Sequence, residues 1–225
     1  LWCGPIGEGN LIFTSSVAVY GDSNGNIVDE NFRLDTRSNR STILIAAEEA
    51  ILLRQGNVIR LAGLYNDFRG PHTYWMKLAS EGKTIDTNAD GIVNLIHYED
   101  AASLVLATVQ TGLKSTVFLG VDNEAVTKEE ICRSALASKL FPNSKIPQFK
   151  AAQGPIGKRC NGQLTRSLLK WKPQYPSFRT YMRRLGGEVI LDEEEDRKAA
   201  KLTTSLDDEK DDVLFDIPEL DSKPK

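Results

Sequence analysis

The sequence has little cysteine, little histidine and no long apolar run. Its three cysteines, Cys3, Cys132 and Cys160, are far apart and odd in number, so they indicate neither a disulfide framework nor a metal site and favour a reducing compartment. The longest apolar stretches, such as residues 43–47, are far shorter than the roughly 18 residues that a membrane-spanning helix needs. With 225 residues, 40% of them apolar, the chain is predicted to form one ordinary soluble domain without a membrane or a metal as partner.

A convincing glycine-rich phosphate-binding turn is also missing. Such a turn follows a strand and opens a helix, so that backbone N–H groups hold a pyrophosphate. Residues 4–9 contain three glycines, but only three residues precede Gly4, which leaves no space for a strand. Residues 154–159 imitate a phosphate loop, yet their glycines are too close together and no Ser or Thr follows Lys158. We interpret both segments as turns, the second one positively charged and at the surface.

Charge is distributed unevenly along the chain. Residues 188–225 hold 14 acidic and 6 basic side chains, whereas residues 1–187 hold 17 and 22. Because the acidic segment has few apolar anchors, it is predicted to be a disordered tail after a folded domain of residues 1–187. The alternative is a tail that docks on a protein partner through residues 213–217. The basic residues near Lys158 are too sparse for a nucleic-acid surface, so nucleic acid is not expected as a partner.

Strand-like and helix-like segments alternate through residues 11–140. Expected strands cover residues 11–14, 58–62, 94–97 and 117–120, and expected helices cover residues 41–53, 73–80, 101–111 and a segment opening at Thr127. Glu99 or Asp100 is expected to cap the third helix, and Thr127 with Glu130 forms a capping-box pattern. Alternation at this spacing is typical of crossover units and predicts an α/β fold with a parallel sheet.

The first strand leads into hydroxyl groups, and this is the most informative feature of the sequence. An apolar run, residues 11–13, is followed by Thr14, Ser15 and Ser16, and then by Tyr20. Ligands in open α/β sheets bind at the carboxyl ends of the strands. Ser16 is therefore expected either to line a ligand pocket or to hydrogen-bond only within its own turn. Tyr20 is expected to pack against its neighbours or to contact the ligand.

This strand end resembles the Ser-Ser-x-x-x-Tyr-Gly segment of the extended short-chain dehydrogenase/reductases, the NAD-dependent epimerase/dehydratase family. Four further segments resemble that family's motifs in the same order: residues 60–65 (Arg-x-x-x-x-Tyr), 94–100 (Ile-His-Val-x-Asp), 117–123 (a late strand and loop) and 171–178 (Gly-Trp-x-Pro-x-Tyr). The resemblance spans about residues 10–183. It implies the carboxyl-side portion of a Rossmann-like, doubly wound parallel sheet, a small C-terminal substrate-side subdomain, and NAD or NADP as cofactor.

The chain departs from this family at the Tyr-x-x-x-Lys pair that transfers the proton, since residues 21–64 contain neither Tyr nor Lys. Alignment of the family's acidic residue with Glu48 puts Arg40 and Leu44 in place of the pair, and alignment with Glu49 puts Ser41 and Ile45 there. In this respect the chain is similar to atypical, cofactor-binding members from bacteria and from plant and algal plastids. That similarity implies a soluble intracellular protein of the chloroplast or cytoplasm.

The family's glycine-rich first half would occupy about 100 or more residues before Leu1, at about 30 residues per crossover unit. A truncated gene model is therefore expected. The residue that selects NAD or NADP would lie in that half.

The resemblance places the nicotinamide beside the exits of two strands, and the cofactor-binding candidates are Thr14, Ser15, Ser16, Gly63, Leu64 and Tyr65. The catalytic candidates are Ser16 and His97, with Asp100 near enough in sequence to orient the imidazole; alternatively His97 is a structural residue that seals a loop. Arg69 and His72 are candidates for gripping an anionic substrate, although an exposed loop arginine needs no such role. Arg60, inside an apolar strand, is expected to pair with a carboxylate or to emerge near a phosphate.

Three functions stay open at this point. The first is a non-catalytic NAD(P)-binding protein of the epimerase/dehydratase type, which the missing Tyr and Lys favour. The second is an active NAD(P)-dependent epimerase, dehydratase or reductase that acts on a nucleotide-sugar or another small carbonyl compound. The third is a scaffold or docking protein that binds its partner through the acidic tail.

Overall fold

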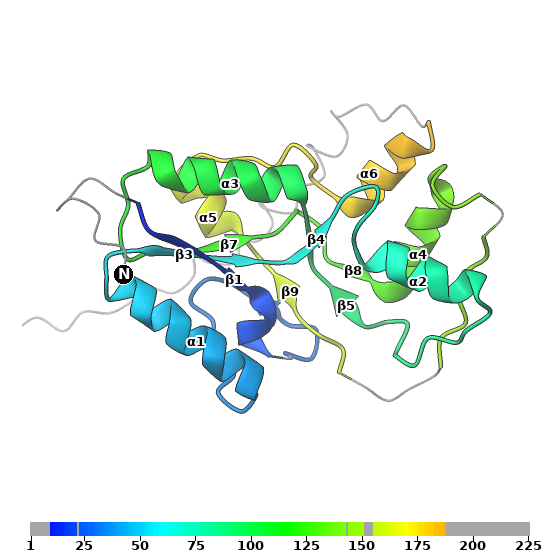
Figure 1. The fold of residues 1–225 in the computed structure, drawn as a ribbon, viewed down its shortest axis with the longest axis horizontal. Coiled ribbons are helices and arrows are strands. Elements are labelled where there is room, and N and C mark those ends of the chain that lie inside the picture. The colour runs from blue at the N-terminus through cyan, green and yellow to red at the C-terminus, as the bar shows by residue number, and fades with distance from the viewer. Residues whose placement is uncertain (1–9, 22, 143, 151–154, 188–225) are drawn as a thin grey trace, which may run out of the picture. The chain divides into compact units, whose positions relative to one another are not determined.

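The computed structural model describes residues 10–21, 23–142, 144–150 and 155–187, and all of them fall in one compact unit (Figure 1). The acidic segment of residues 188–225, and with it the prediction of a disordered or docking tail, lies outside the described residues, as does Cys3. The elements in chain order are β1 (Ile12–Ser16), the 3-10 helix η1 (Val17–Tyr20), β2 (Ile27–Val28), α1 (Asn39–Leu52), β3 (Asn57–Leu61), β4 (Gly63–Tyr65), α2 (Pro71–Ser80), β5 (Ile92–Val93), β6 (Leu95–His97), α3 (Tyr98–Gln110), β7 (Val117–Gly120), β8 (Val126–Thr127), α4 (Lys128–Ala137), β9 (Arg159–Cys160), α5 (Gln163–Leu169) and α6 (Phe178–Leu185).

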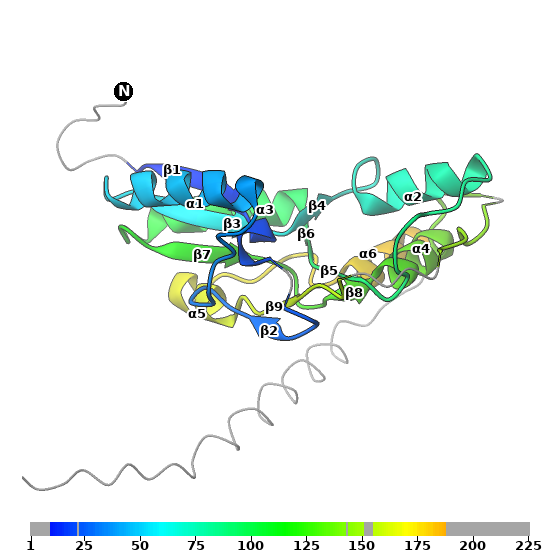
Figure 2. The same ribbon diagram turned by 90° about the horizontal axis from the view of Figure 1, so that it is seen from below.

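A parallel sheet in the order β1-β3-β7 forms the centre of the fold. Helix α1 connects β1 to β3 and helix α3 connects β6 to β7, and these two helices cover opposite faces of the sheet (Figures 1 and 2). The buried side chains of the sheet, among them Ile59 and Phe118, pack against both helices in one apolar core. The predicted α/β fold with a doubly wound parallel sheet is confirmed.

The chain continues past β3, after a single break at Ala62, into β4, which pairs in parallel with β6. Beside this second pair, helix α4 packs on both α2 and α6, and a second apolar cluster contains Tyr65 and Phe178. Helix α4 starts with the expected capping box of Thr127 and Glu130. The two side chains satisfy backbone N–H groups that the first turn of a helix leaves unpaired.

Two local expectations are wrong. Strand β1 runs to Ser16 instead of ending at Thr14, so both serines belong to the strand. Helix α3 is capped by His97 and not by Glu99 or Asp100, because the helix begins directly after β6 and the strand's last residue takes the cap position. The imidazole Nδ1 of His97 accepts the backbone N–H of Glu99 at 3.2 Å.

Candidate functional site

The carboxyl end of β1 turns directly into η1, and Ser16 caps this short helix. Its backbone is extended, and its Oγ accepts the backbone N–H of Ala18 at 3.2 Å. The segment ends at Gly21, whose φ of 63° is a left-handed conformation that favours glycine. Of the two roles expected for Ser16, the turn-capping one is thus present. The side chain is only partly buried, so its hydroxyl is not sealed inside the core.

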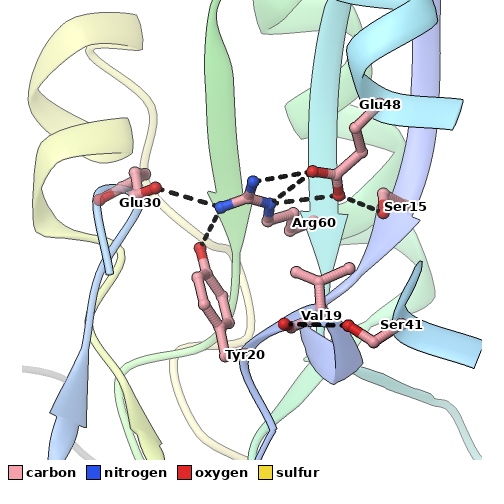
Figure 3. A network of polar contacts seen from close by, with 7 residues as sticks. All are labelled: Ser15, Val19, Tyr20, Glu30, Ser41, Glu48 and Arg60. Atoms are coloured by element: carbon pink, nitrogen blue, oxygen red, sulfur yellow. Dashed lines mark hydrogen bonds and ion pairs between the residues drawn. The ribbon is translucent and has the colours of Figure 1, made fainter. Parts of the chain in front are cut away.

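Behind this strand end lies a buried polar network around Arg60 (Figure 3). Its guanidinium donates from Nε and Nη2 to the carboxylate of Glu48, with an Nη2–Oε2 distance of 2.7 Å, and only 5% and 2% of the two side chains are exposed. Its Nη1 donates to Tyr20 Oη at 2.9 Å and to the carbonyl oxygen of Glu30 at 3.1 Å. The expectation that Arg60 has a carboxylate partner is confirmed.

The same network uses the hydroxyl of Ser15, which donates to Glu48 Oε1 at 2.5 Å. Neighbouring side chains of a strand point to opposite faces, so Ser15 points toward α1 while Thr14 and Ser16 point the other way. Thr14 is exposed. The guanidinium carbon of Arg60 lies over the ring of Tyr20, 5.0 Å from the ring centre. Burial raises the pKa of the Tyr20 phenol to about 12. Ser15 and Tyr20 thus make internal contacts in this structure.

Strand β4, which continues the path of β3, places Gly63, Leu64 and Tyr65 in different environments. Gly63 is exposed, and a Cβ on it would lie 3.0 Å from the side chain of Leu95, so the backbone approaches its neighbour closely there. Leu64 is half-buried, and Tyr65 is fully buried. Among the described residues, the hydroxyl of Tyr65 has no hydrogen-bond partner.

His97 lies beside Tyr65, in a cluster of aromatic rings that also contains Tyr175 and Tyr181. The ring centres of His97 and Tyr175 are 4.0 Å apart, and those of His97 and Tyr65 are 5.3 Å apart. Burial lowers the pKa of His97 below its ordinary value, so its imidazole is neutral at pH 7. Asp100 does not orient this ring through a hydrogen bond: its carboxylate accepts the backbone N–H groups of Gln174 and Tyr175, at 2.6 and 2.9 Å.

The structure does not bring the two catalytic candidates together. Ser16 lies opposite Leu61 in the sheet, whereas His97 lies opposite Tyr65, four residues further along the chain. At about 3.3 Å per strand residue, this places them roughly 13 Å apart along the strand direction. One substrate atom cannot contact both side chains at that separation.

The two substrate-binding candidates also have different surroundings. Arg69 is exposed in the loop between β4 and α2, where its backbone N–H donates to Asn66 Oδ1 at 2.8 Å. His72 is fully buried in the first turn of α2, next to Phe141 and Phe178, and burial lowers its pKa to about 4. At neutral pH, His72 is therefore an uncharged interior residue while Arg69 carries its charge at the surface.

Sequence reasoning missed two buried acids. Glu30 accepts both the backbone N–H and the hydroxyl of Thr165, at 3.0 and 2.6 Å, and Thr165 in turn accepts the N–H of Leu119 in β7. Asp122 is completely buried after β7, and burial raises the pKa of its carboxyl well above the ordinary value. Both residues follow apolar strand residues in the sequence, but acids are also common in turns, so this pattern does not distinguish them.

No group of three or more His, Cys, Asp or Glu side chains suited to a metal occurs among the described residues. The helices in that part of the chain are also too short or too polar to cross a membrane. Cys132 and Cys160 are free thiols whose pKa burial raises to about 12. They are thus protonated at neutral pH.

Comparison with solved structures finds this arrangement of strands and helices in known proteins. The first of the similar structures is a conserved protein of unknown function from Silicibacter pomeroyi DSS, with 26% sequence identity and a TM-score of 0.65 over 78% of this chain and 65% of that one. A UDP-glucose 4-epimerase from Thermotoga maritima with UDP-glucose has 16% identity and a TM-score of 0.64 over 78% and 62% of the two chains. A dTDP-glucose 4,6-dehydratase from Bacillus anthracis in complex with NAD has 18% identity and a TM-score of 0.63 over 79% and 60%.

The fold is a Rossmann-type α/β fold. Its structural neighbours include Rossmann proteins of the NAD-dependent epimerase/dehydratase type. Among curated proteins, YeeZ of Escherichia coli K12 is 32% identical to this Rossmann chain over 103 residues, which make up 44% of the chain and 35% of YeeZ. The chain thus covers about a third of that curated relative and 60–65% of the three solved structures above. No protein-family model matches the sequence.

Proposed function

We propose that this chain belongs to an NAD(P)-binding Rossmann protein of the epimerase/dehydratase type that lacks the usual Tyr/Lys chemistry. The Rossmann-type fold supports the first part of this proposal, and the burial of Glu48 supports the second. Glu48 is bonded to Arg60 and Ser15 inside the fold, whereas Glu49 is exposed, so Glu48 is the acid with a fixed structural role. This favours the alignment in which Arg40 and Leu44 occupy the positions of the Tyr and Lys.

Neither of those two side chains suits the missing chemistry. An arginine stays protonated at neutral pH and is a poor proton donor, and a leucine carries no charge that could lower the pKa of a phenol. Arg40 is exposed on the first turn of α1, and Leu44 packs against the apolar core. Proton transfer of the family's usual kind therefore has no donor in this helix.

The strand exits supply the part of a dinucleotide site that would hold the nicotinamide. Ser16, Gly63 and Leu64 offer a hydroxyl, an exposed glycine and an apolar surface at the carboxyl ends of β1 and β3, where Rossmann proteins bind their cofactor. Thr14 adds an exposed hydroxyl two residues before the end of β1. In the role proposed for them, Ser15 and Tyr65 support this surface from inside. A bound NAD or NADP would supply a hydride acceptor or donor.

Within the described ranges, no helix that follows a strand opens on a glycine-rich turn, so these residues provide no pyrophosphate cradle. The solved neighbours are longer than the part that this chain covers, and three of them are described as complexes with NAD. We therefore propose that the pyrophosphate is held by a glycine-rich segment encoded upstream of residue 1, in a longer protein.

The experiment begins with sequencing of the native transcript at its 5′ end, followed by calorimetric titration of NAD and NADP into the protein that it encodes. We expect an in-frame strand and glycine-rich turn, saturable binding of one dinucleotide, and no turnover of nucleotide-sugars. The variant Ser16→Ala should weaken binding, while Ser80→Ala, at the exposed C-terminal end of α2, should not. An upstream glycine-rich half combined with no dinucleotide binding would overturn the proposal.

An active enzyme is the second candidate, because epimerases and dehydratases of nucleotide-sugars are among the solved neighbours. Incubation of the same longer protein with NAD and UDP-glucose or dTDP-glucose distinguishes the two candidates. Epimerised or dehydrated product that disappears in Ser16→Ala would favour the enzyme.

A docking role for residues 188–225 is tested by deletion of that segment, which should abolish partner capture and leave dinucleotide binding unchanged.

A further inference from the structure

A cavity of about 620 Å³ lies where α2, the segment that follows it and the start of α4 meet. The two helices pack on each other (Figure 1). None of the residues that line the cavity belongs to β1, η1, β3 or β4, so it is separate from the proposed cofactor surface. Its volume falls within the roughly 300–1,000 Å³ of pockets that hold small molecules.

Helix α2 gives this cavity an apolar and aromatic wall. Tyr74, Trp75 and Leu78 line it from the helix, and Ile85 lines it from the segment after α2. Residues 74 and 78 are one helical turn apart and therefore share a face of α2. Tyr74 is 61% exposed, and Trp75 and Leu78 are partly exposed. The wall thus offers apolar surface that can cover a flat group of a ligand.

Lys128, the first residue of α4, is held at the cavity by its neighbours. Its Nζ donates to the hydroxyl of Thr87, and its backbone N–H donates to the carbonyl oxygen of Gly91 at 3.1 Å. A Cβ on Gly91 would lie 2.8 Å from this Nζ, so the glycine leaves the space that the ammonium occupies. The side chain is therefore positioned before any ligand arrives, which lowers the entropy cost of binding.

This ammonium has no carboxylate partner among the described residues. The next residue, Glu129, pairs with Arg133 at 2.6 Å. Asp86, the acid in the cavity lining, pairs with Lys150 at 3.7 Å. Burial lowers the pKa of the Lys128 ammonium, and no neighbouring acid offsets this effect. A negatively charged ligand would supply the missing opposite charge.

Two neighbouring side chains at the cavity have hydrogen-bond donors to spare. Lys128 Nζ uses one of its three N–H groups on Thr87. The Thr87 hydroxyl accepts that bond, so its own O–H is left to donate, and the part of the chain that the structure describes offers it no acceptor. An ammonium and a hydroxyl side by side match the two oxygens of a carboxylate, which only accepts hydrogen bonds.

We propose that this cavity binds a small organic acid with a flat apolar group. Its carboxylate accepts from Lys128 Nζ and from the Thr87 hydroxyl, and its apolar group lies against Tyr74, Trp75 and Leu78. The cavity lining holds two lysines and one acid, a balance that favours an anion. The proposal is independent of dinucleotide binding, because it needs no residue of the proposed NAD(P) surface.

The test is an NMR titration of the protein that the native transcript encodes, with three probes: phenylacetate, its neutral analogue phenylacetamide, and acetate. We expect saturable shifts of the Thr87 and Lys128 amide signals and of the Trp75 indole signal with phenylacetate. Phenylacetamide should bind about tenfold more weakly, because it lacks the charge that pairs with the ammonium. Acetate should also bind about tenfold more weakly, because it lacks the ring that covers the apolar wall.

Three variants sharpen the result. Lys128→Met keeps an apolar side chain and removes the charge, so it should abolish the preference for phenylacetate over phenylacetamide. Thr87→Val should weaken phenylacetate binding several-fold. The matched control is Lys77→Met, which removes an exposed lysine of α2 outside the cavity lining and should leave all three affinities unchanged.

Equal affinity for phenylacetate and phenylacetamide, or an unchanged preference in Lys128→Met, would overturn the proposal. So would the absence of saturable shifts at these residues in a folded protein. Equal affinity for phenylacetate and acetate would overturn the contact with the apolar wall.

Discussion

Two buried polar regions of this protein differ in whether their hydrogen-bonding groups are satisfied. Around Arg60, a guanidinium, a carboxylate, a phenol and a serine hydroxyl are joined by hydrogen bonds of 2.5–3.2 Å. Around His97, by contrast, Nε2 and the neighbouring hydroxyl of Tyr65 have no partner among the described residues. Both regions are as deeply buried as the apolar core.

The difference separates a satisfied polar network from one that leaves buried polar atoms unsatisfied. A charge network that is fully hydrogen-bonded has nothing left to offer a ligand, and removal of one member leaves an uncompensated buried group. A donor that is buried without an acceptor costs stability, and such a cost is more often tolerated where function needs it. The Arg60 network therefore holds the strands in place, whereas the His97 region keeps two buried polar atoms without a partner among the described residues.

The largest expected effect breaks the Arg60 network. Glu48→Ala leaves the guanidinium of Arg60 buried without its carboxylate, so we expect the free energy of unfolding to fall by about 3–5 kcal/mol. The control is Glu49→Ala at the exposed neighbouring position, which should change it by no more than about 0.5 kcal/mol. Urea unfolding followed by circular dichroism measures both. Similar losses for the two variants would show that the ion pair is not what stabilises this region.

A smaller effect is expected from Tyr20→Phe. The ring and its contact with Arg60 remain, but one guanidinium N–H loses its phenol acceptor in a buried site, which should cost about 1–3 kcal/mol. The same urea experiment measures the loss. Tyr74→Phe, at an exposed tyrosine, should leave the free energy of unfolding unchanged, so the difference between the two variants reports the buried hydrogen bond.

The smallest effect, and the one that tests the comparison most directly, is expected from Tyr65→Phe. The substitution is chemically identical to the previous one, but here the hydroxyl has no partner, so its removal should leave stability unchanged or raise it by up to about 1 kcal/mol. Opposite signs for Tyr20→Phe and Tyr65→Phe would support the contrast between the two regions. A loss of about 2 kcal/mol in Tyr65→Phe would mean that its hydroxyl is bonded after all.

The fold could be predicted because its signals are local. The strand expected over residues 58–62, which is mostly apolar and followed by Gly63, is found at residues 57–61. The capping box of Thr127 and Glu130 is visible in four consecutive residues. The cap of α3 could not be predicted, because the competition between His97, Glu99 and Asp100 depends on where β6 ends. Asp100 does not cap the helix, because its carboxylate accepts the backbone N–H of Gln174, in a loop 74 residues further along the chain.

The candidate sites were predictable only in part, for the same reason. A charged Arg60 within an apolar strand requires a partner, but the sequence offers several acids, and only the crossover of α1 over β3 selects Glu48. The cavity beside Lys128 was not predicted at all. Its walls come from α2, residues 83–87 and the start of α4, which share no pattern in the sequence and meet only through the packing of α2 on α4.

Strand β1 has one consequence for handling the protein. Within the described residues it pairs only with β3, so the N–H and C=O groups along its other edge have no partner strand. An uncovered strand edge is a template to which any extended segment can add. When this chain is produced by itself, self-association along β1 will therefore compete with folding, and a peptide that completes this edge should keep the protein monomeric.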